Sequence, residues 1–311
     1  MAEFHHRGRT QGPLGLAAIV LLLLPTCALH PTVYEKAAIR KPFRSRPADP
    51  LMVRGRKNAL LDGLGHYLFS FPAKLVLWNW RMENHNISET NEAILRRYIE
   101  VNGLSTTQVR LNTYAPHKEF ARIRANKDVN AGYKYTLGTL SVLFYTLLPD
   151  RLFAGLIGGD SYNPYTNTIH IYSDHSAVVV HEGGHAKDFA QRSRRGTYAL
   201  LRLLPFVDLF QEERASEDAL SYFYCRRDDE NELNAYPLLY PAYATYVAGY
   251  VPLLGGPILI VGAHIVGRTE RDDRREVLAR ERKDMFHGTC WVSDVERDTT
   301  LGLTPPAPTW P

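Results

Sequence analysis

The five residues from His181 to His185 read His-Glu-Gly-Gly-His, and this run constrains the fold more than any other part of the chain. Residues four apart share a face of an α-helix, so a helix here points both imidazoles in one direction. The residues just before it, Ala177 to Val180, are all apolar and predict that the helix starts in the core. Histidines and a carboxylate are costly to bury without partners. The motif therefore predicts a buried helix with a polar cluster on one side.

The spacing of this motif is typical of a zinc site. His181 and His185 can bind one Zn²⁺ ion as neutral imidazoles, which leaves the ion strongly Lewis acidic. Zinc lowers the pKa of water towards about 7, and Glu182 is placed to take the proton of that water and pass it to a leaving amine. With 12 histidines in 311 residues, an HExxH motif is rarely a coincidence. The alternative is a set of ordinary core or surface histidines.

A catalytic zinc site needs a third protein ligand. The metzincin pattern requires a glycine and a histidine three and six residues after His185, but this chain has Asp188 and Gln191 there. A deformylase-like site requires an upstream cysteine within the domain, and the sequence has none. The remaining common choice is a glutamate from a following helix.

The segment from Glu213 to Glu217 supplies such a glutamate. On a helix, both carboxylates would share a face with Leu209 and Leu220, and two acids on an apolar stripe need a partner. We therefore predict Glu213 as the third ligand, with Glu217 orienting one of the histidines. The alternative is a solvated acidic patch that also includes Glu212 and Asp218.

Together, these motifs resemble the gluzincin branch of the zincin metallopeptidases. Within it, the chain resembles the membrane-associated group of HtpX and the CAAX prenyl endopeptidases, whose site is HExxH followed by ExxxD. The resemblance covers roughly residues 90 to 225. It implies that His181, His185 and Glu213 bind zinc and that Glu182 is the general base. Glu217 stands where that group usually has Asp, and the multiple spanning helices of those enzymes are not evident in this chain.

Hydrophobic patterning predicts the elements around the motif. A helix begins at Ser88 or Asn91 and stops near Asn102-Gly103, and a strand covers residues 108–113. Residues 168–172 alternate like an edge strand, and a further helix covers residues 206–224. The fold class is thus α+β and zincin-like, with a small sheet whose edge strand packs on the HExxH helix beside a second, ligand-bearing helix. Gly183 and Gly184 weaken a helix, so we expect another element to approach closely there.

Composition predicts five segments. Residues 1–29 form a signal sequence or membrane anchor, 30–58 a basic Pro-rich linker, and 59–240 the metallopeptidase domain. Residues 241–267 are a hydrophobic segment, read as a membrane hairpin or a buried helix, and 268–311 are a charged helix and a Pro-rich tail.

The N-terminal segment predicts export. The apolar run Leu14 to Leu24 is as short as the core of a signal peptide, and Leu24-Pro25-Thr26-Cys27 loosely resembles a lipobox. A cleaved signal, a lipidated Cys27 and an uncleaved anchor all remain open. Residues 1–60 carry ten Lys and Arg against three acids, so the basic charge adjoins the apolar run. We expect a membrane-associated protein and no nucleic-acid partner.

The sequence thus predicts a zinc-dependent metallopeptidase that hydrolyses peptide bonds of a peptide or protein substrate at or near a membrane. Its cofactor would be Zn²⁺. The alternative is a membrane-tethered binding or assembly protein with a zincin-like fold and a structural or empty zinc site. Tyr222, His264 and His287 are weaker candidates to stabilise the oxyanion of the transition state.

Overall fold

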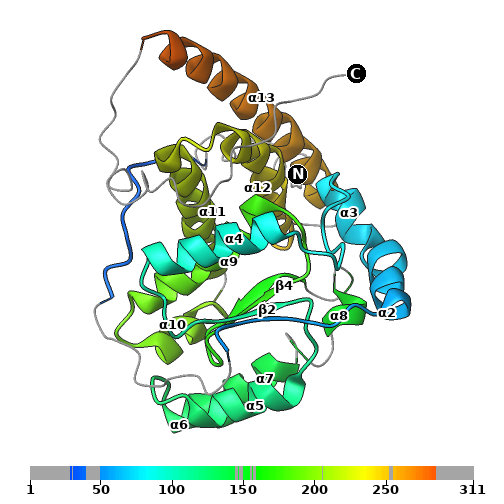
Figure 1. Cartoon of the computed structure of the whole chain (residues 1–311), viewed down its shortest axis with the longest axis vertical. Helices are drawn as coiled ribbons and strands as arrows, with labels where there is room; N and C mark the ends of the chain where they lie inside the picture. Colours follow the sequence, from blue (N-terminus) through cyan, green and yellow to red (C-terminus); the bar gives the residue numbers. More distant parts are fainter. Residues whose placement is uncertain are drawn as a thin grey trace, which may run out of the picture.

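The computed structural model describes residues 29, 31–39, 50–143, 146, 150–154, 156, 159–204, 206–251 and 255–284. The predicted signal or anchor segment lies outside these residues except for Leu29, and so do most of the predicted tail and His287. Helices dominate the described chain, around one small mixed sheet, so the molecule is α+β (Figure 1). None of the described helices combines the length and the apolar character needed to cross a bilayer.

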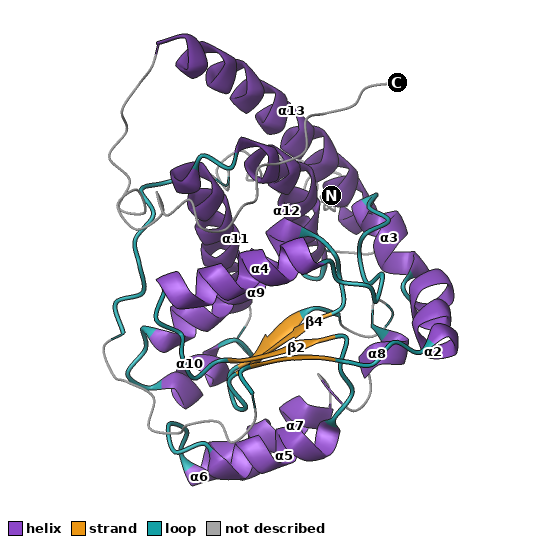
Figure 2. Ribbon diagram, in the orientation of Figure 1, coloured by secondary structure: helices purple, strands orange, loops and turns teal. Residues whose placement is uncertain are grey.

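The sheet has four short strands in the order β1-β2-β4-β3 (Figure 2). Strands β1 (Met52–Arg54), β2 (Gln108–Leu111) and β4 (Thr168–Ile171) run parallel, and β3 (Ser161–Asn163) pairs antiparallel with β4. β3, not β4, is therefore the edge strand beside β4.

The prediction that residues 168–172 form an edge strand is wrong, because β4 lies between two partners. The alternation misled because the polar side chains of β4 are buried rather than solvated. His170 Nε2 lies 3.8 Å from Oε2 of Glu119, a buried residue of α5 (Pro116–Ala125). A histidine with a buried acidic partner looks like a surface residue in the sequence.

Helices cover both faces of the sheet (Figure 2). On one face lie α4 (Glu89–Val101) and α9 (Ser176–Ala190), which pack against each other. On the other lie α5, α6 (Ala131–Tyr133), the π-helical turn η3 (Lys134–Gly138) and α7 (Thr139–Val142). The helix that carries the HExxH motif is thus packed against both the sheet and α4.

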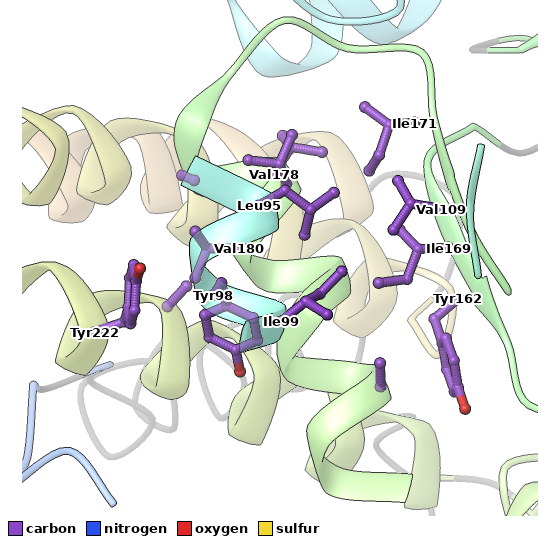
Figure 3. Packing of buried hydrophobic residues seen from close by; sticks show 14 of the residues in the cluster. Leu95, Tyr98, Ile99, Val109, Tyr162, Ile169, Ile171, Val178, Val180 and Tyr222 are labelled. Atoms are coloured by element: carbon purple, nitrogen blue, oxygen red, sulfur yellow. The ribbon is translucent and has the colours of Figure 1, made fainter. Parts of the chain in front are cut away.

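The predicted boundaries of α4 are confirmed. The Ser88 side chain accepts a hydrogen bond from the backbone N–H of Asn91, Asn102 ends the helix, and Gly103 follows with a φ of 63°. The buried residues of α4 pack against α9: Figure 3 shows Leu95 beside Val178 and Ile99 on the side of the strand residues, whereas Tyr98 lies on the side of Tyr222. This core fixes the first half of the motif-bearing helix.

A second group of helices continues the chain beyond α9. It comprises α10 (Arg195–Leu201), α11 (Val207–Arg226), α12 (Asp229–Ala248) and α13 (Gly255–Asp284). α11 packs against α9 and α12, and α13 packs along α12. The hydrophobic segment 241–267 therefore falls on the end of α12 and the first part of α13.

Before the sheet-covering helices, the chain forms α2 (Ala59–Leu64), the π-helical turn η2 (Gly65–Phe69) and α3 (Phe71–Leu77), and α8 (Asp150–Phe153) contacts α2 and η2. Part of the predicted linker is packed onto the domain. Tyr34 is buried, its N–H donates to Sγ of Cys225 at 3.3 Å, and Tyr240 donates to the carbonyl of Leu29 at 3.2 Å. Residues 31–39 are thus an extended strap across helices of the C-terminal half.

Candidate metal centre

Three side chains from two helices meet at one point. Nε2 of His181 lies 3.1 Å from Nε2 of His185 and 3.1 Å from Oε2 of Glu212, and Nε2 of His185 lies 3.4 Å from the same oxygen. The histidines lie one turn apart on α9, and the glutamate is on α11. Among the described residues, these three form the group of potential metal ligands.

The triangle fits a tetrahedral metal ion. Ligands bound to zinc at about 2.0–2.1 Å in a tetrahedron lie about 3.3–3.4 Å from one another. The three measured separations fall close to that value. Both histidines present Nε2 to this point. Two nitrogens and one carboxylate oxygen are also the donor set that zinc prefers in catalytic sites.

The structure brings Glu212 to the histidines in place of the predicted Glu213. The inner face of α11 consists of Glu212, Ala215, Ser216 and Ala219, all buried, whereas Glu213 is partly exposed. The sequence argument assumed the face that contains Leu209 and Leu220. The observed inner face of α11 and the predicted one differ by a rotation of about 100° around the helix axis, which corresponds to one residue along the helix. Glu217 is likewise partly exposed, and Glu213 is not part of the ligand cluster.

Neighbouring side chains orient the three ligands. Arg202, which follows α10, donates to Oε1 of Glu212 and leaves Oε2 facing the histidines. The Ser216 hydroxyl lies 3.3 Å from Nδ1 of His181, on the side of the ring away from the cluster. Ser216 comes one helical turn after Glu212, so one helix supplies both a ligand and a partner for another ligand.

The surroundings shift the pKa values of the three candidate ligands in different directions. Burial opposes ionisation of Glu212, but His185 and Arg202 hold the pKa of its carboxyl well below the usual range. Burial lowers the pKa of His185, whereas the hydrogen bond to Glu212 raises that of His181 despite burial. A carboxylate that stays ionised is what a cation site requires.

Glu182 lies beside the cluster with a free oxygen. It is 6% exposed, and Oε2 has no hydrogen-bond partner among the described residues. Burial raises the pKa of its carboxyl to about 8. A buried carboxyl oxygen without a hydrogen-bond partner is costly, and groups with strongly shifted pKa values are concentrated at functional sites.

The cluster opens into a cleft of about 1040 Å³. Its other walls are mostly apolar and come from α3, β3, α12 and α13. They include Val76, Tyr162, Leu239, Tyr243 and Ile260. The edge strand β3 borders the cleft and, among the described residues, pairs on one side only, so an extended chain could pair with the other side.

The glycines of the motif lie where other elements approach. A Cβ on Gly183 would come within 2.6 Å of Cδ1 of Tyr98, and one on Gly184 within 3.0 Å of the carbonyl oxygen of Ala215. The expectation of close approach is confirmed at both positions. It explains two glycines in the middle of a 15-residue helix.

The weaker candidates lie elsewhere. Tyr222 is buried against Tyr98 and Tyr34, and His264 stacks on Trp78 while Nε2 donates to the carbonyl of Val76 at 2.8 Å. His287 is outside the described residues. None of the three lines the cleft in the part of the chain that the structure describes.

The sequence argument missed Glu212, Ser216 and Arg202. A signal for the first two was present: Ala215, Ser216 and Ala219 form a small-residue face that matches Gly183-Gly184, and Glu212 continues that face by one turn. No local pattern marks Arg202, whose role depends on the path of the chain between α10 and α11.

The chain was compared with protein-family models, curated proteins and solved structures, and nothing matches in any of the three.

Proposed function

We propose that the protein is a zinc-dependent metallopeptidase of the zincin type, with His181, His185 and Glu212 as ligands and Glu182 as general base. The observation that carries the proposal is the ligand triangle, whose dimensions suit a tetrahedral ion, next to the buried carboxyl of Glu182, whose Oε2 has no hydrogen-bond partner among the described residues. The third ligand differs from the one that the resemblance to gluzincins implies. The order of the site, HExxH on one helix and a glutamate on a later one, is retained.

Each residue of the site has a distinct task in this proposal. Zinc, when bound, supplies Lewis acidity and lowers the pKa of water. Glu182 accepts the proton of the attacking water and delivers it to the leaving amine. The free side of β3 holds the substrate backbone in an extended conformation, since an edge strand offers unpaired N–H and C=O groups.

The cleft walls suggest the class of substrate. An apolar cleft with few polar groups favours large apolar side chains next to the scissile bond, because their burial contributes about 25 cal/mol per Å². Acidic side chains would meet Glu182 and Glu212 in the same cleft. We therefore propose hydrolysis beside aliphatic or aromatic residues, at or near a membrane.

The first experiment compares zinc content in Glu212→Gln and Glu213→Gln. The two positions are adjacent on α11, so each variant controls for the other. Purified without chelators and measured by mass spectrometry, the wild type and Glu213→Gln should hold near-stoichiometric zinc, and Glu212→Gln should lose most of it. Loss of zinc in Glu213→Gln alone would contradict the proposed ligand set.

A second variant separates catalysis from metal binding. Glu182→Gln should retain zinc and lose peptide hydrolysis by at least two orders of magnitude, because the amide cannot accept the proton. Unchanged hydrolysis would remove Glu182 from the mechanism. Zinc binding without hydrolysis of any peptide by the wild type would favour the membrane-tethered binding protein, which needs only a structural site.

A further inference from the structure

Large apolar side chains are exposed along α2, η2 and α3. Seven of them lie mostly three or four residues apart, with two adjacent, and each is between 38% and 69% exposed: Leu60, Leu64, Tyr67, Leu68, Phe71, Leu75 and Trp78. Within α2, Leu60 and Leu64 lie one turn apart and share a face, and within α3 Phe71 and Leu75 do the same. Trp80, just beyond α3, is also more than half exposed.

α3 is apolar on its opposite side as well. There Pro72, Ala73, Val76 and Leu77 line the cleft of the candidate metal centre. A helix that is apolar all round is normally buried on every side. The cleft accounts for one side of α3, and nothing among the described residues covers the other.

The exposed stripe continues onto α13. Trp78 stacks on His264 with ring centroids 4.3 Å apart and planes 14° from parallel, so the two helices lie side by side (Figure 1). Ile258, Val261 and Ile265 follow at spacings of three and four on α13, and all three are about half exposed or more. We call these ten residues and Trp80 the apolar face.

The charge around the apolar face is basic. Within residues 56–81, which contain α2, η2 and α3, the exposed charged side chains are those of Arg56, Lys57 and Arg81, and the single acid, Asp62, is half-buried. Lys74 is buried and donates to backbone carbonyls, so it does not add to this charge. The chain also reaches this segment from residues 30–58, which are rich in Lys and Arg. A stripe of Leu with Trp and Tyr, next to basic residues, is typical of helices that lie in the interface of an anionic bilayer.

We infer that the apolar face docks onto the surface of a membrane containing anionic lipids. α2, η2 and α3 lie in the plane of the headgroups, with Leu68, Phe71 and Leu75 towards the acyl chains and Trp78 at the boundary. The apolar face then lies on the outer side of the wall that bounds the cleft. This inference does not depend on zinc or on hydrolysis, and each can fail without the other.

The test uses the full chain, which has four tryptophans, at positions 78, 80, 291 and 310. Substitution of Trp80, Trp291 and Trp310 by Phe leaves Trp78 as the reporter. The protein is reconstituted into phosphatidylcholine–phosphatidylglycerol vesicles whose acyl chains are brominated near the headgroup. Trp78 fluorescence should be quenched by at least half, and its accessibility to aqueous acrylamide should fall several-fold.

The matched control moves the reporter to a different exposed aromatic position. In a chain with all four tryptophans changed to Phe, Tyr135→Trp places the reporter on η3, on the other side of the sheet, where Tyr135 is 63% exposed. This reporter should show no quenching even if an N-terminal anchor holds the protein on the vesicle. Equal quenching at both positions, or none at Trp78, would overturn the inference.

Two further results would reveal a different occupant of the apolar face. Protection of Trp78 without lipid, together with self-association, would show a second copy of the chain there and contradict membrane docking. Protection in a lipid-free monomer would show that the chain covers the face itself. Hydrogen exchange of the unmodified protein provides an independent measurement: vesicles should slow exchange in residues 59–78, and no slowing would count against docking.

Discussion

A Cβ atom on Gly184 would lie 3.0 Å from the carbonyl oxygen of Ala215 and 3.1 Å from its Cα. The neighbour at this point is backbone, so it cannot move aside as a flexible side chain would. α9 and α11, the two helices that carry the candidate ligands, therefore approach so closely that a side chain at position 184 would require the backbone of α11 to shift by a few tenths of an ångström. His185 and Glu212 lie within a turn of this contact, and their separation of 3.4 Å depends on it.

Gly184→Ala should separate the two helices. We expect a loss of about 1–3 kcal/mol in the free energy of unfolding, as for overpacked cores, and weaker zinc binding. Denaturant titration and zinc competition measure the two effects. Gly63→Ala is the control, because Gly63 is also helical and a Cβ there meets nothing within 4 Å. Alanine at that position should be neutral or stabilising by up to about 1 kcal/mol.

Arg202→Gln should weaken zinc binding by about 10–100-fold, the range found when a partner of a metal ligand is removed. Without the guanidinium, Oε1 of Glu212 loses its donor and the carboxylate can rotate away from the histidines. A competition titration with a chromogenic chelator gives the affinity. Arg214→Gln changes an exposed arginine of α11 and should leave the affinity unchanged. Equal losses in both variants would indicate a general charge effect.

His175 should make the protein sensitive to mild acid. Its Nδ1 accepts the N–H of Ala177 at the start of α9, and burial, reinforced by Arg81, lowers its pKa to about 4. The unfolded chain binds the proton near pH 6.5 and the folded chain resists it. The stability from the neutral ring is therefore present above pH 6.5 and lost as the pH falls towards 4, by up to about 3 kcal/mol.

His175→Asn tests this pH dependence, because asparagine also caps helices but does not titrate. Urea midpoints measured at pH 7 and pH 5 should fall less in the variant than in the wild type. Parallel declines in the two proteins would assign the sensitivity to other groups.

Glu119 should make folding stability depend on pH over a more acidic range than His175 does. Burial opposes its ionisation, yet His170 and Arg122 hold its pKa at about 2. A depressed carboxyl pKa stabilises the fold above the unfolded value and stops doing so as the pH falls towards 2. Glu119→Gln should cost a few kcal/mol at pH 6 and much less at pH 3. A constant cost at both values would contradict this account.

The parts of the fold that could be predicted are those set by local chemistry. Ser88 and Gly103 mark the ends of α4, and the HExxH spacing places two imidazoles on one helix face. The third ligand could not be derived in this way, since Glu212, Glu213 and Glu217 are all acids on one helix. The choice among them depends on which face meets α9, which is a tertiary property. Similarly, His170 reads as a solvated residue until Glu119, 51 positions away, is placed beside it.

The strap of residues 31–39 has a consequence for the order of folding. Its contacts lie far along the chain: Thr32 donates to Ser221 Oγ at 2.9 Å, and Tyr34 contacts Cys225. Ribosomes release the N-terminus first, so the strap has no partner until α11 and α12 have been made. Closing such a long loop is slow, because its entropy is lost before the contacts form. The first part of the domain to be synthesised is therefore among the last to dock, because its partners lie on α11 and α12.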